Sequence, residues 1–331
     1  MTPAEAPYAD LTPERVLDAV DALGLRSDGR LLQLNSFENR VYLVGLDDGS
    51  QCVAKFYRPA RWSDAAIVEE HAFCAELAAQ EIPAVAPLVL DGATLHRDAA
   101  LPDHRYAIFP RQGGRTPELE DDAALEWLGR YLGRIHAVGA TTRYRARPTL
   151  DVDSYGVEAR DALVAGDWLP DELRAAWIDA ADRALDAARR IWADTGEVRL
   201  LRLHGDCHVG NVLWTDSGPH FVDFDDSRMG PAVQDLWMLL TGEGPSLCAQ
   251  RDALLRGYRV FADFDRRELL LVEALRTLRL VHYSAWIARR WHDPAFPAAF
   301  PWFGSARYWQ ERIAELHAQL EAMREPPLLA D

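Results

Sequence analysis

The sequence predicts an α+β fold of two lobes, a small N-terminal lobe with an antiparallel sheet and a mainly helical C-terminal lobe. Short apolar runs separated by turn residues occupy the first third of the chain, a pattern typical of β-strands. From Asp121 onward, longer segments carry apolar residues at the spacing of an amphipathic helix. We therefore place the N-terminal lobe at residues 1–110 and the helical lobe at residues 111–331.

Length and composition argue against several classes of protein. The 331 residues suffice for two lobes with a sizeable core, because 49% of them are hydrophobic. No apolar run approaches the roughly 20 residues of a membrane-spanning helix, and the N-terminus lacks the pattern of a signal peptide, so we expect a cytoplasmic protein. The cysteines have no paired spacing, which indicates free thiols. A formal charge of −16 argues against nucleic acid and membranes as partners, and without coiled-coil heptads a monomer is the default.

The N-terminal lobe is predicted to contain five strands and one helix. The strands are expected at 31–34, 40–44, 52–57, 88–90 and 105–110, and the helix at about 63–80, with Ser63 as its N-cap. The third strand places Lys55 between apolar residues, where an ammonium group needs a partner. We expect Lys55 to bind nucleotide phosphates and to pair with Glu70, which lies nearer the apolar face of the helix than the solvated Glu69. A lysine reaching solvent from a sheet edge is the alternative.

Two further segments of this lobe are candidate nucleotide contacts. Residues 35–40 have the position of a phosphate-covering loop but contain no glycine. We expect the amide and hydroxyl of Ser36 and the side chain of Asn39 to donate to phosphate oxygens, with a plain turn as the alternative. Phe109 lies where the last strand leaves the sheet. The crossing that follows, residues 111–115, is expected to contact adenine through backbone groups.

The run LHGDCHVGNVLW at 203–214, followed by FVDFDD at 221–226, predicts a phosphoryl-transfer centre. In that chemistry one carboxylate contacts the attacking hydroxyl, while an amide oxygen and a second carboxylate hold the metal ion. Asp206 fits the first role, and Asn211 and Asp223 fit the others. Asp223 follows a hairpin whose strands are expected at 212–214 and 221–222. The pattern predicts transfer of phosphoryl from ATP to a hydroxyl, with Mg²⁺.

Neighbouring residues support other interpretations and roles. His204, Asp206 and His208 alternate as zinc or iron ligands on a strand would, so a metallohydrolase is the rival interpretation. Asp225 and Asp226 are expected to hold a second ion or to bond neighbouring backbone. Asp235 is expected to brace the catalytic loop from the start of a helix.

Helices are predicted at 122–138, 170–194, 232–241, 246–262, 266–292 and 305–323, and a packed surface loop at the aromatic, proline-rich stretch 294–302.

The motifs HGDCHVGN, VDFDD, VAKFYRP and LNSFENRVY, with ARRWHDPAFPAAFPWF near the C-terminus, resemble the stress response kinase A family. That family lies within the aminoglycoside and choline phosphotransferase branch of the protein-kinase-like fold. The resemblance extends from about Leu31 to Pro327. It implies a Mg²⁺-dependent bacterial serine/threonine kinase that uses ATP under stress. Its proton acceptor falls on Asp206, its magnesium ligands on Asn211 and Asp223, and its loop serine on Ser36.

The class of molecule that accepts the phosphoryl group is predicted less directly than the reaction. Few residues separate Asp223 from the helix near Ala232, far fewer than the segment on which ordinary protein kinases bind peptides, so the chain itself favours a small-molecule acceptor. The resemblance favours serine and threonine in proteins, autophosphorylation included. We therefore predict a protein kinase. A kinase of aminoglycoside-, choline- or homoserine-like alcohols and a nucleotide-sensing pseudokinase are the alternatives.

Overall fold

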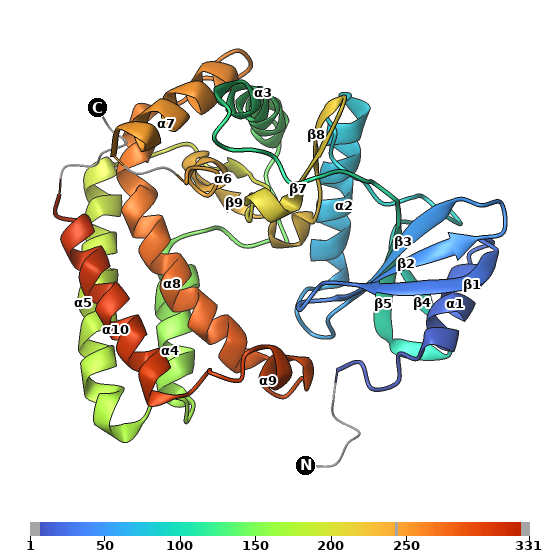
Figure 1. Ribbon diagram of the computed structural model, residues 1–331, viewed down its shortest axis with the longest axis horizontal. Helices are drawn as coiled ribbons and strands as arrows, with labels where there is room; N and C mark the ends of the chain where they lie inside the picture. The colour runs from blue at the N-terminus through green and yellow to red at the C-terminus, as the bar shows by residue number, and fades with distance from the viewer. Residues whose placement is uncertain (1–6, 242–243, 326–331) are drawn as a thin grey trace. The chain divides into compact units, whose positions relative to one another are not determined.

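The computed structural model describes residues 7–241 and 244–325 (Figure 1). The chain divides into two compact units, which we call unit 1 and unit 2. Unit 1 comprises the chain up to Pro117 together with Tyr144–Arg147 and Gly210–Asp226. Unit 2 comprises Glu118–Arg143, Pro148–Val209 and the chain from Ser227 onward. Unit 1 contains the sheet and unit 2 is mainly helical, which confirms the predicted α+β class.

Unit 1 is built on a five-stranded antiparallel sheet with the order β1-β2-β3-β5-β4 (Figure 1). The strands are β1 (Ser27–Leu34), β2 (Arg40–Leu46), β3 (Gln51–Tyr57), β4 (His96–Asp98) and β5 (Leu101–Pro110). The prediction of a strand at 88–90 is wrong. Pro87 has no amide donor and the chain turns at Asp91 and Gly92, both with positive φ, so only Leu88 bonds to β5, through the carbonyl of Ile108 at 2.7 Å. The strand that pairs with β5 at this edge of the sheet is β4 instead.

The two faces of the sheet carry different helices because side chains alternate along each strand. α1 (Pro13–Asp21), which the sequence analysis did not predict, packs with Ala54 and Phe56 of β3 in one apolar cluster. α2 (Asp64–Ala79) begins after the predicted cap Ser63, whose hydroxyl accepts from the amide of Ala66. It packs through Ile67 on Tyr57, whose side chain faces away from α1. Lys55 shares that second face by the same alternation.

The predicted hairpin of unit 1 is confirmed as β7 (Val212–Thr215) and β8 (Gly218–Phe221), with a tighter turn than expected. Phe221 attaches the hairpin to the segment after α2, because its amide donates to Pro83 at 2.7 Å and its carbonyl accepts from Val85 at 3.0 Å. A short 3₁₀ helix, η3 (Val209–Asn211), precedes the hairpin, and another, η4 (Phe224–Asp226), follows it. The hairpin thus places Asn211 and Asp223 at its two open ends.

Unit 2 consists of helices and one small two-stranded sheet. The helices are α3 (Asp122–Gly139), α4 (Glu158–Ala165), α5 (Asp171–Thr195), α6 (Val233–Trp237), α7 (Gly244–Tyr258), α8 (Val272–Arg289), α9 (Ala295–Ala299) and α10 (Ala306–Ala322). Short turns precede two of them, η2 (Asp153–Val157) before α4 and η5 (Arg266–Leu271) before α8, and the sheet pairs β6 (Leu201–Arg202) with β9 (Met229–Gly230). The six predicted helices are confirmed, although α6 is shorter than expected.

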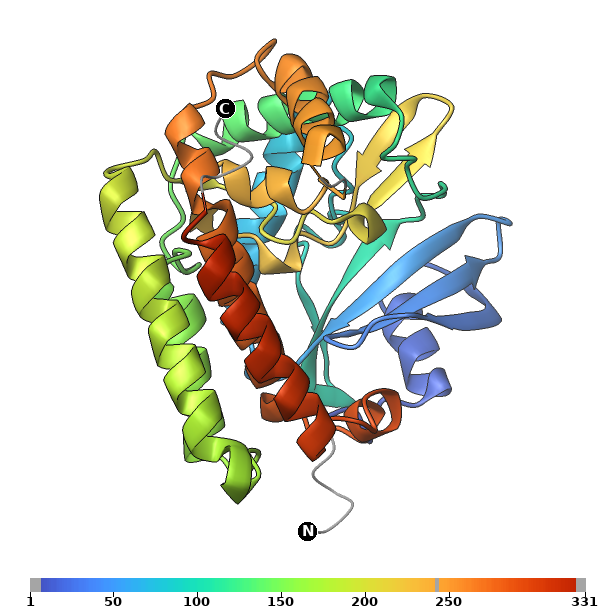
Figure 2. The ribbon, with the colours of Figure 1, turned by 60° about the vertical axis from the view of Figure 1, so that its left-hand side comes forward.

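The helices of unit 2 pack closely on one another. α5 and α10 lie side by side along α8 (Figure 2). Between α5 and α10 the rings of Trp177 and Trp309 meet edge to face, with centroids 5.7 Å apart. α3 and α7 cross so closely that a Cβ on Gly257 would clash with the carbonyl oxygen of Glu126. The predicted surface loop at 294–302 contains α9, and Phe296 and Phe300 are buried in the core of the unit. Across the described residues, every helix is too short or too polar to cross a membrane.

Candidate active site

Lys55 forms the centre of the site in unit 1. Its Nζ donates to Asp223 Oδ1 at 2.9 Å and lies 3.3 Å from Asp225 Oδ1. The side chain is 8% exposed on a central strand, so the alternative of a sheet-edge lysine is wrong. Burial alone would lower the pKa of this ammonium, but Asp223, Asp225 and Glu70 raise it well above its ordinary value. Lys55 therefore stays charged.

Lys55 is also the only lysine in the sequence, which has 36 lysine and arginine residues together. Every other cationic position of this kind is arginine. Lysine is a compact point charge, whereas arginine is a planar group with fixed donor directions, so the two are not equivalent where several oxygens converge. The single lysine is therefore a further sequence signal for this position, beside the motif VAKFYRP.

The predicted ion pair between Lys55 and Glu70 is wrong. Glu70 is 1% exposed and is bound by Arg147, whose Nη2 donates to Oε2 at 2.9 Å. Arg147 also donates to the carbonyls of Ala66 and Asp225, at 2.8 and 2.9 Å, so one planar guanidinium joins α2 to the segment after Asp223. Burial raises the pKa of Glu70 to about 7, against the opposing effects of Lys55 and Arg147.

Glu69 holds the segment that carries Arg147. Its carboxylate accepts from the amides of Arg145, Ala146 and Arg147 at 2.8, 2.9 and 3.2 Å. The expectation of a solvated Glu69 is therefore wrong. Two successive glutamates of α2 instead fix residues 145–147. Glu69 accepts from the backbone amides of this segment, and Glu70 accepts from the guanidinium of Arg147.

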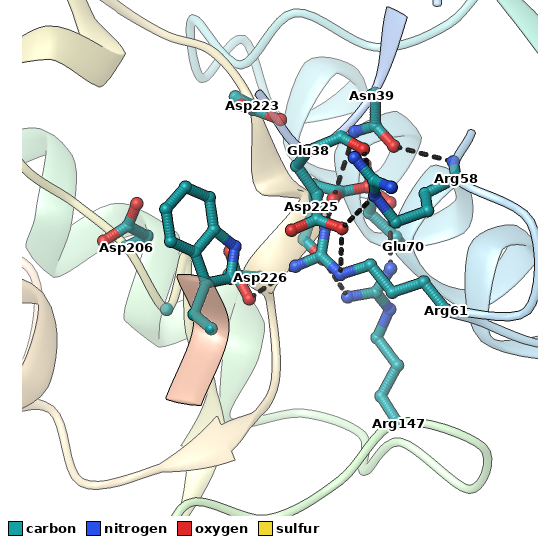
Figure 3. Close-up of polar contacts among 12 residues, drawn as sticks. Glu38, Asn39, Arg58, Arg61, Glu70, Arg147, Asp206, Asp223, Asp225 and Asp226 are labelled. Atoms are coloured by element: carbon teal, nitrogen blue, oxygen red, sulfur yellow. Dashed lines mark hydrogen bonds and ion pairs between the residues drawn. The ribbon is translucent and has the colours of Figure 1, made fainter. Parts of the chain in front are cut away.

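Asp225 lies in a cluster of buried charges (Figure 3). Arg61 donates to Asp225 Oδ2 through Nη1 and to Asp226 Oδ1 through Nη2, the latter at 2.9 Å. Burial alone would raise the pKa of Asp225, but Arg61 and Lys55 hold it at about 2. The two carboxylates that were expected to hold a second ion or bond the backbone are thus both bound to Arg61.

In the loop between β1 and β2, the two residues that were expected to contact phosphate, Ser36 and Asn39, have different surroundings. Asn39 is 2% exposed, its Nδ2 donates to Asp225 Oδ2 at 3.2 Å, and its Oδ1 accepts from the amide of Arg58 at 3.1 Å (Figure 3). Both ends of the Asn39 amide thus bond protein groups, and its expected donation to phosphate stays a prediction. The Arg58 guanidinium donates to the carbonyls of Phe37 and Glu38, each at 2.9 Å, which fixes the loop without glycine. Ser36 lies outside this network, apart from accepting the Asn39 amide at 3.4 Å.

A cavity of about 370 Å³ in unit 1 brings most of the predicted contacts together. Its polar lining includes Ser36, Lys55, Asn211 and Asp223, and its apolar lining includes Phe109. A cavity with apolar walls and a few convergent polar groups is typical of a site for a small molecule or cofactor. The apolar wall can contact the flat base of a nucleotide, and Lys55 can face the phosphates of the same nucleotide.

The lining residues also fit a magnesium ion. Asn211 supplies an amide oxygen, and Asp223 supplies a carboxylate that is 50% exposed. Mg²⁺ prefers oxygen ligands and is usually held by one or two carboxylates together with substrate phosphates. Asp223 adopts a φ of 61°, a left-handed conformation that aspartate tolerates better than most residues. This turn separates the exposed Asp223 from the buried Asp225.

Asp206 belongs to unit 2, where Arg279 of α8 binds it. Arg279 Nη1 donates to Asp206 Oδ1 at 2.7 Å, and His208 Nε2 lies 3.5 Å from Oδ2. The side chains of Arg279 and Asp206 are 38% and 24% exposed. Asp206 is thus a carboxylate that solvent can reach, with Arg279 at its Oδ1.

Asp235 braces the loop before Asp206, as predicted. It is fully buried at the start of α6 and accepts from the amides of His204 and Gly205 at 2.7 and 2.8 Å. His136 Nε2 lies 3.0 Å from its Oδ2. Gly205 has a φ of 89°, which a residue with a side chain adopts only with strain. The backbone before Asp206 is therefore fixed from a helix.

The rival metallohydrolase site is not supported. Within 7–241 and 244–325, no group of three or more His, Cys, Asp and Glu side chains is arranged to hold a metal ion. His204, the first ligand of the proposed set, is fully buried and its Nδ1 accepts from the amide of Asp206 at 3.3 Å. All the cysteines are free thiols, as predicted.

The arginines that pair with the acidic residues were not predicted from the sequence. Arg61 and Arg147 lie 164 and 77 residues from the carboxylates they bind, and Arg279 lies 73 residues from Asp206. One signal was present, because three aspartates close together at 223–226 need cations when they are buried. The pattern could not indicate which arginines supply them.

Comparison with known proteins agrees with this geometry. Residues 30–272 match the model of the phosphotransferase enzyme family, APH. A relative named stress response kinase A, from Escherichia coli (strain K12), is 42% identical over 321 residues, which cover 97% of this chain and 96% of the relative. A relative named serine/threonine protein kinase RdoA, from Salmonella typhimurium (strain LT2), is 43% identical over the same shares.

Solved structures share the fold at lower identity. Amicoumacin kinase hAmiN in complex with AMP-PNP, Ca²⁺ and Ami has a TM-score of 0.72 at 18% identity, covering 97% of this chain and 96% of that one. A microcompartment-associated aminopropanol kinase has a TM-score of 0.67 at 20% identity, covering 93% of this chain and 96% of that one. These likenesses confirm the predicted protein-kinase-like fold.

Proposed function

Because the chain belongs to the phosphotransferase enzyme family and is a kinase, of the stress response kinase A type, we propose that it transfers phosphoryl from ATP to a protein serine or threonine. The observation that carries the proposal is the Lys55–Asp223 pair in a cavity that Asn211 also lines. A charged lysine beside two oxygen donors suits a nucleotide with Mg²⁺. A bacterial stress response is the setting that the relatives' names support.

Each residue then has a defined part in the reaction. Lys55 binds the phosphates, and its ion pair keeps it protonated for that task. Mg²⁺ held by Asn211 and Asp223 would neutralise phosphate charge. Asp206 orients the acceptor hydroxyl and accepts its proton as the oxygen–phosphorus bond forms, while the bond to the bridging oxygen breaks and ADP leaves with the electron pair.

The acceptor class rests on two observations that favour different answers. The relative named serine/threonine protein kinase RdoA supports a protein acceptor, the chain's own residues included. A small-molecule acceptor is the second candidate, because only η4 and β9 lie between Asp223 and α6, leaving little chain on which a peptide could bind. The aminopropanol and amicoumacin kinases of similar fold act on small molecules by their names.

Incubation with ATP labelled at the γ-phosphate tests the proposal. The enzyme is supplied with Mg²⁺ alone, with a generic acceptor protein, and with a panel of amino alcohols and aminoglycosides. We expect label on protein serine or threonine, and loss of label when the ion is chelated. Label on a small alcohol alone would overturn the protein acceptor, and nucleotide binding without any transfer would favour a pseudokinase.

A further inference from the structure

The carboxylate of Asp206 is engaged by a side chain that solvent can reach. Arg279 holds Oδ1 at 2.7 Å, with both side chains partly exposed. Ion pairs of this exposure contribute little to stability, because water screens the charges. An incoming anionic group can therefore compete with Asp206 for Arg279 without a large cost.

Arg279 lies on the same face of α8 as two aromatic residues. Tyr283 follows four residues later and Trp286 three after that, the spacings that place side chains next to one another on a helix. The rings of Tyr283 and Trp286 stack, with centroids 5.8 Å apart and planes 18° apart. A continuous strip therefore runs along α8 from the carboxylate of Asp206.

Trp302, after α9, extends this strip. Phe300 is 9% exposed and lies 5.8 Å from Trp286 and 5.6 Å from Trp302, so one buried ring supports both. Tyr283 and Trp302 are 38% and 42% exposed. We call Arg279, Tyr283, Trp286 and Trp302 the α8 surface.

The composition of the α8 surface points to one kind of occupant. Tyrosine, tryptophan and arginine are enriched where proteins bind proteins. α8 carries Arg276, Arg279 and Arg289 against Glu273, so it is basic in a chain whose formal charge is −16. Rings on an open surface suit an extended segment, and a guanidinium suits a carboxylate, which it can bind through two donors.

We infer that the α8 surface binds the acceptor, a protein segment whose serine or threonine is flanked by acidic side chains. An acidic side chain of the acceptor binds Arg279 and draws it from Asp206, and the hydroxyl takes its place at Oδ1. The rings of Tyr283, Trp286 and Trp302 contact the rest of the segment. This inference rests on the proposed function and adds the identity of the acceptor.

Matched peptides test it in the full-length enzyme. Each has one central serine and the same length, with glutamate, glutamine or lysine as its neighbours. We expect kcat/KM to be at least about tenfold higher for the glutamate peptide than for the glutamine peptide, the effect of one charge-assisted hydrogen bond. Arg279→Gln should abolish this ratio, and Arg279→Lys should keep part of it, because the charge remains.

The aromatic residues are tested separately. Tyr283→Ala and Trp302→Ala should raise KM for the glutamate peptide by about fivefold or more with little change in kcat, because these rings contact the acceptor away from its hydroxyl. Trp127→Ala, at a 40% exposed tryptophan of α3, and Arg324→Gln, at a 61% exposed arginine beyond α10, are the controls and should match the wild type. Thermal melting of each variant verifies that it is folded.

The outcomes separate this inference from the proposed function. Phosphorylated peptides with equal glutamate-to-glutamine ratios in wild type and Arg279→Gln would overturn the inference and leave the kinase intact. Unchanged KM in both aromatic variants would also overturn it. Transfer to a small alcohol with no label on any peptide or protein would overturn the proposed function, and this inference with it.

Discussion

Lys55 pairs with Asp223 and not with the glutamate of the neighbouring helix. The 2.9 Å contact between Lys55 Nζ and Asp223 Oδ1 joins β3 to the chain just after the β7–β8 hairpin, while Glu70 is bound to Arg147. Lys55 and the metal-ligand candidate Asp223 therefore hold each other in the cavity of unit 1. Mg²⁺ at Asp223 would compete with Lys55 for that carboxylate, and phosphates would offer Lys55 new partners. This exchange would make binding of nucleotide and of the ion interdependent.

Replacing Lys55 should weaken nucleotide binding. Loss of a charge-assisted contact to phosphate costs about 1.5–3 kcal/mol, so Lys55→Ala should reduce affinity for AMP-PNP by at least about tenfold in calorimetry. Lys55→Arg should not restore it, because a planar guanidinium does not fit a buried position shaped for an ammonium. Arg30→Ala, at a 65% exposed arginine of β1, is the control. Wild-type affinity in Lys55→Ala would contradict the assigned role.

The single lysine allows a direct chemical check of the same position. An amine-reactive ATP analogue should modify Lys55 as its only side-chain amine, because the sequence contains no other lysine. Peptide mapping by mass spectrometry locates the adduct. Excess ATP with Mg²⁺ should protect Lys55, and modification that ATP leaves unchanged would place the nucleotide elsewhere.

Asp223 should link nucleotide affinity to Mg²⁺. Wild-type affinity for AMP-PNP should rise by about tenfold or more when Mg²⁺ is added, and Asp223→Asn should remove most of that rise, because an amide carries no charge to hold the ion. Titration with and without chelator measures it. Asp216→Asn, at an exposed residue in the turn of the same hairpin, is the control. An Asp223→Asn variant with the full response to Mg²⁺ would exclude this ligand.

Glu70 should give stability a specific dependence on pH. Its pKa is raised from 4.5 to about 7 by burial, so the folded protein holds the proton more tightly than the unfolded chain does. The stability that Glu70 contributes is full below about pH 4.5 and is lost as pH rises through about 7. Relative to Glu70→Gln, the free energy of unfolding of the wild type should fall by on the order of 3 kcal/mol over that window.

Urea denaturation at several pH values measures this difference. Glu76→Gln, at an exposed glutamate of the same helix, should give a curve parallel to that of the wild type. A constant gap between wild type and Glu70→Gln from pH 4.5 to 8 would show that Glu70 titrates alike in both states.

Asp235→Asn should damage both stability and turnover. Asp235 accepts from two amides before Asp206, and an asparagine cannot accept at both positions with its single oxygen. We expect a loss of about 3 kcal/mol in unfolding free energy and a lower kcat, because the loop that carries Asp206 loses its fixed backbone. Asp179→Asn, at a 66% exposed aspartate of α5, should change neither. Unaltered melting and kcat in Asp235→Asn would remove the bracing role.

Helices in which apolar residues recur at regular helical spacing were predictable from the sequence, and short elements were not. α3, α5 and α10 have sustained helical spacing, whereas α9 has five residues and β6 has two, too few for a period. α1 could have been found, because Thr12 before Pro13 is a helix-start signal.

In the site too, only residues that stand in local motifs could be predicted from the sequence. Lys55, Asn211 and Asp223 stand in local motifs, so their presence in one cavity could be anticipated. Their counter-ions could not, because Arg61 and Arg147 come from distant parts of the chain and only tertiary packing selects them. The bond from Asn39 to Asp225 could not be predicted for the same reason, since the two residues lie 186 residues apart in the sequence.

Asp206→Ala, assayed for nucleotide binding and phosphoryl transfer in one preparation, tests the account most directly. Asp206 is assigned to the acceptor hydroxyl and the cavity of unit 1 to the nucleotide, so the variant should bind AMP-PNP with Mg²⁺ as the wild type does. Its transfer of label from ATP should fall by about 10²–10⁴-fold. Wild-type transfer, or loss of nucleotide binding in a folded variant, would contradict the account.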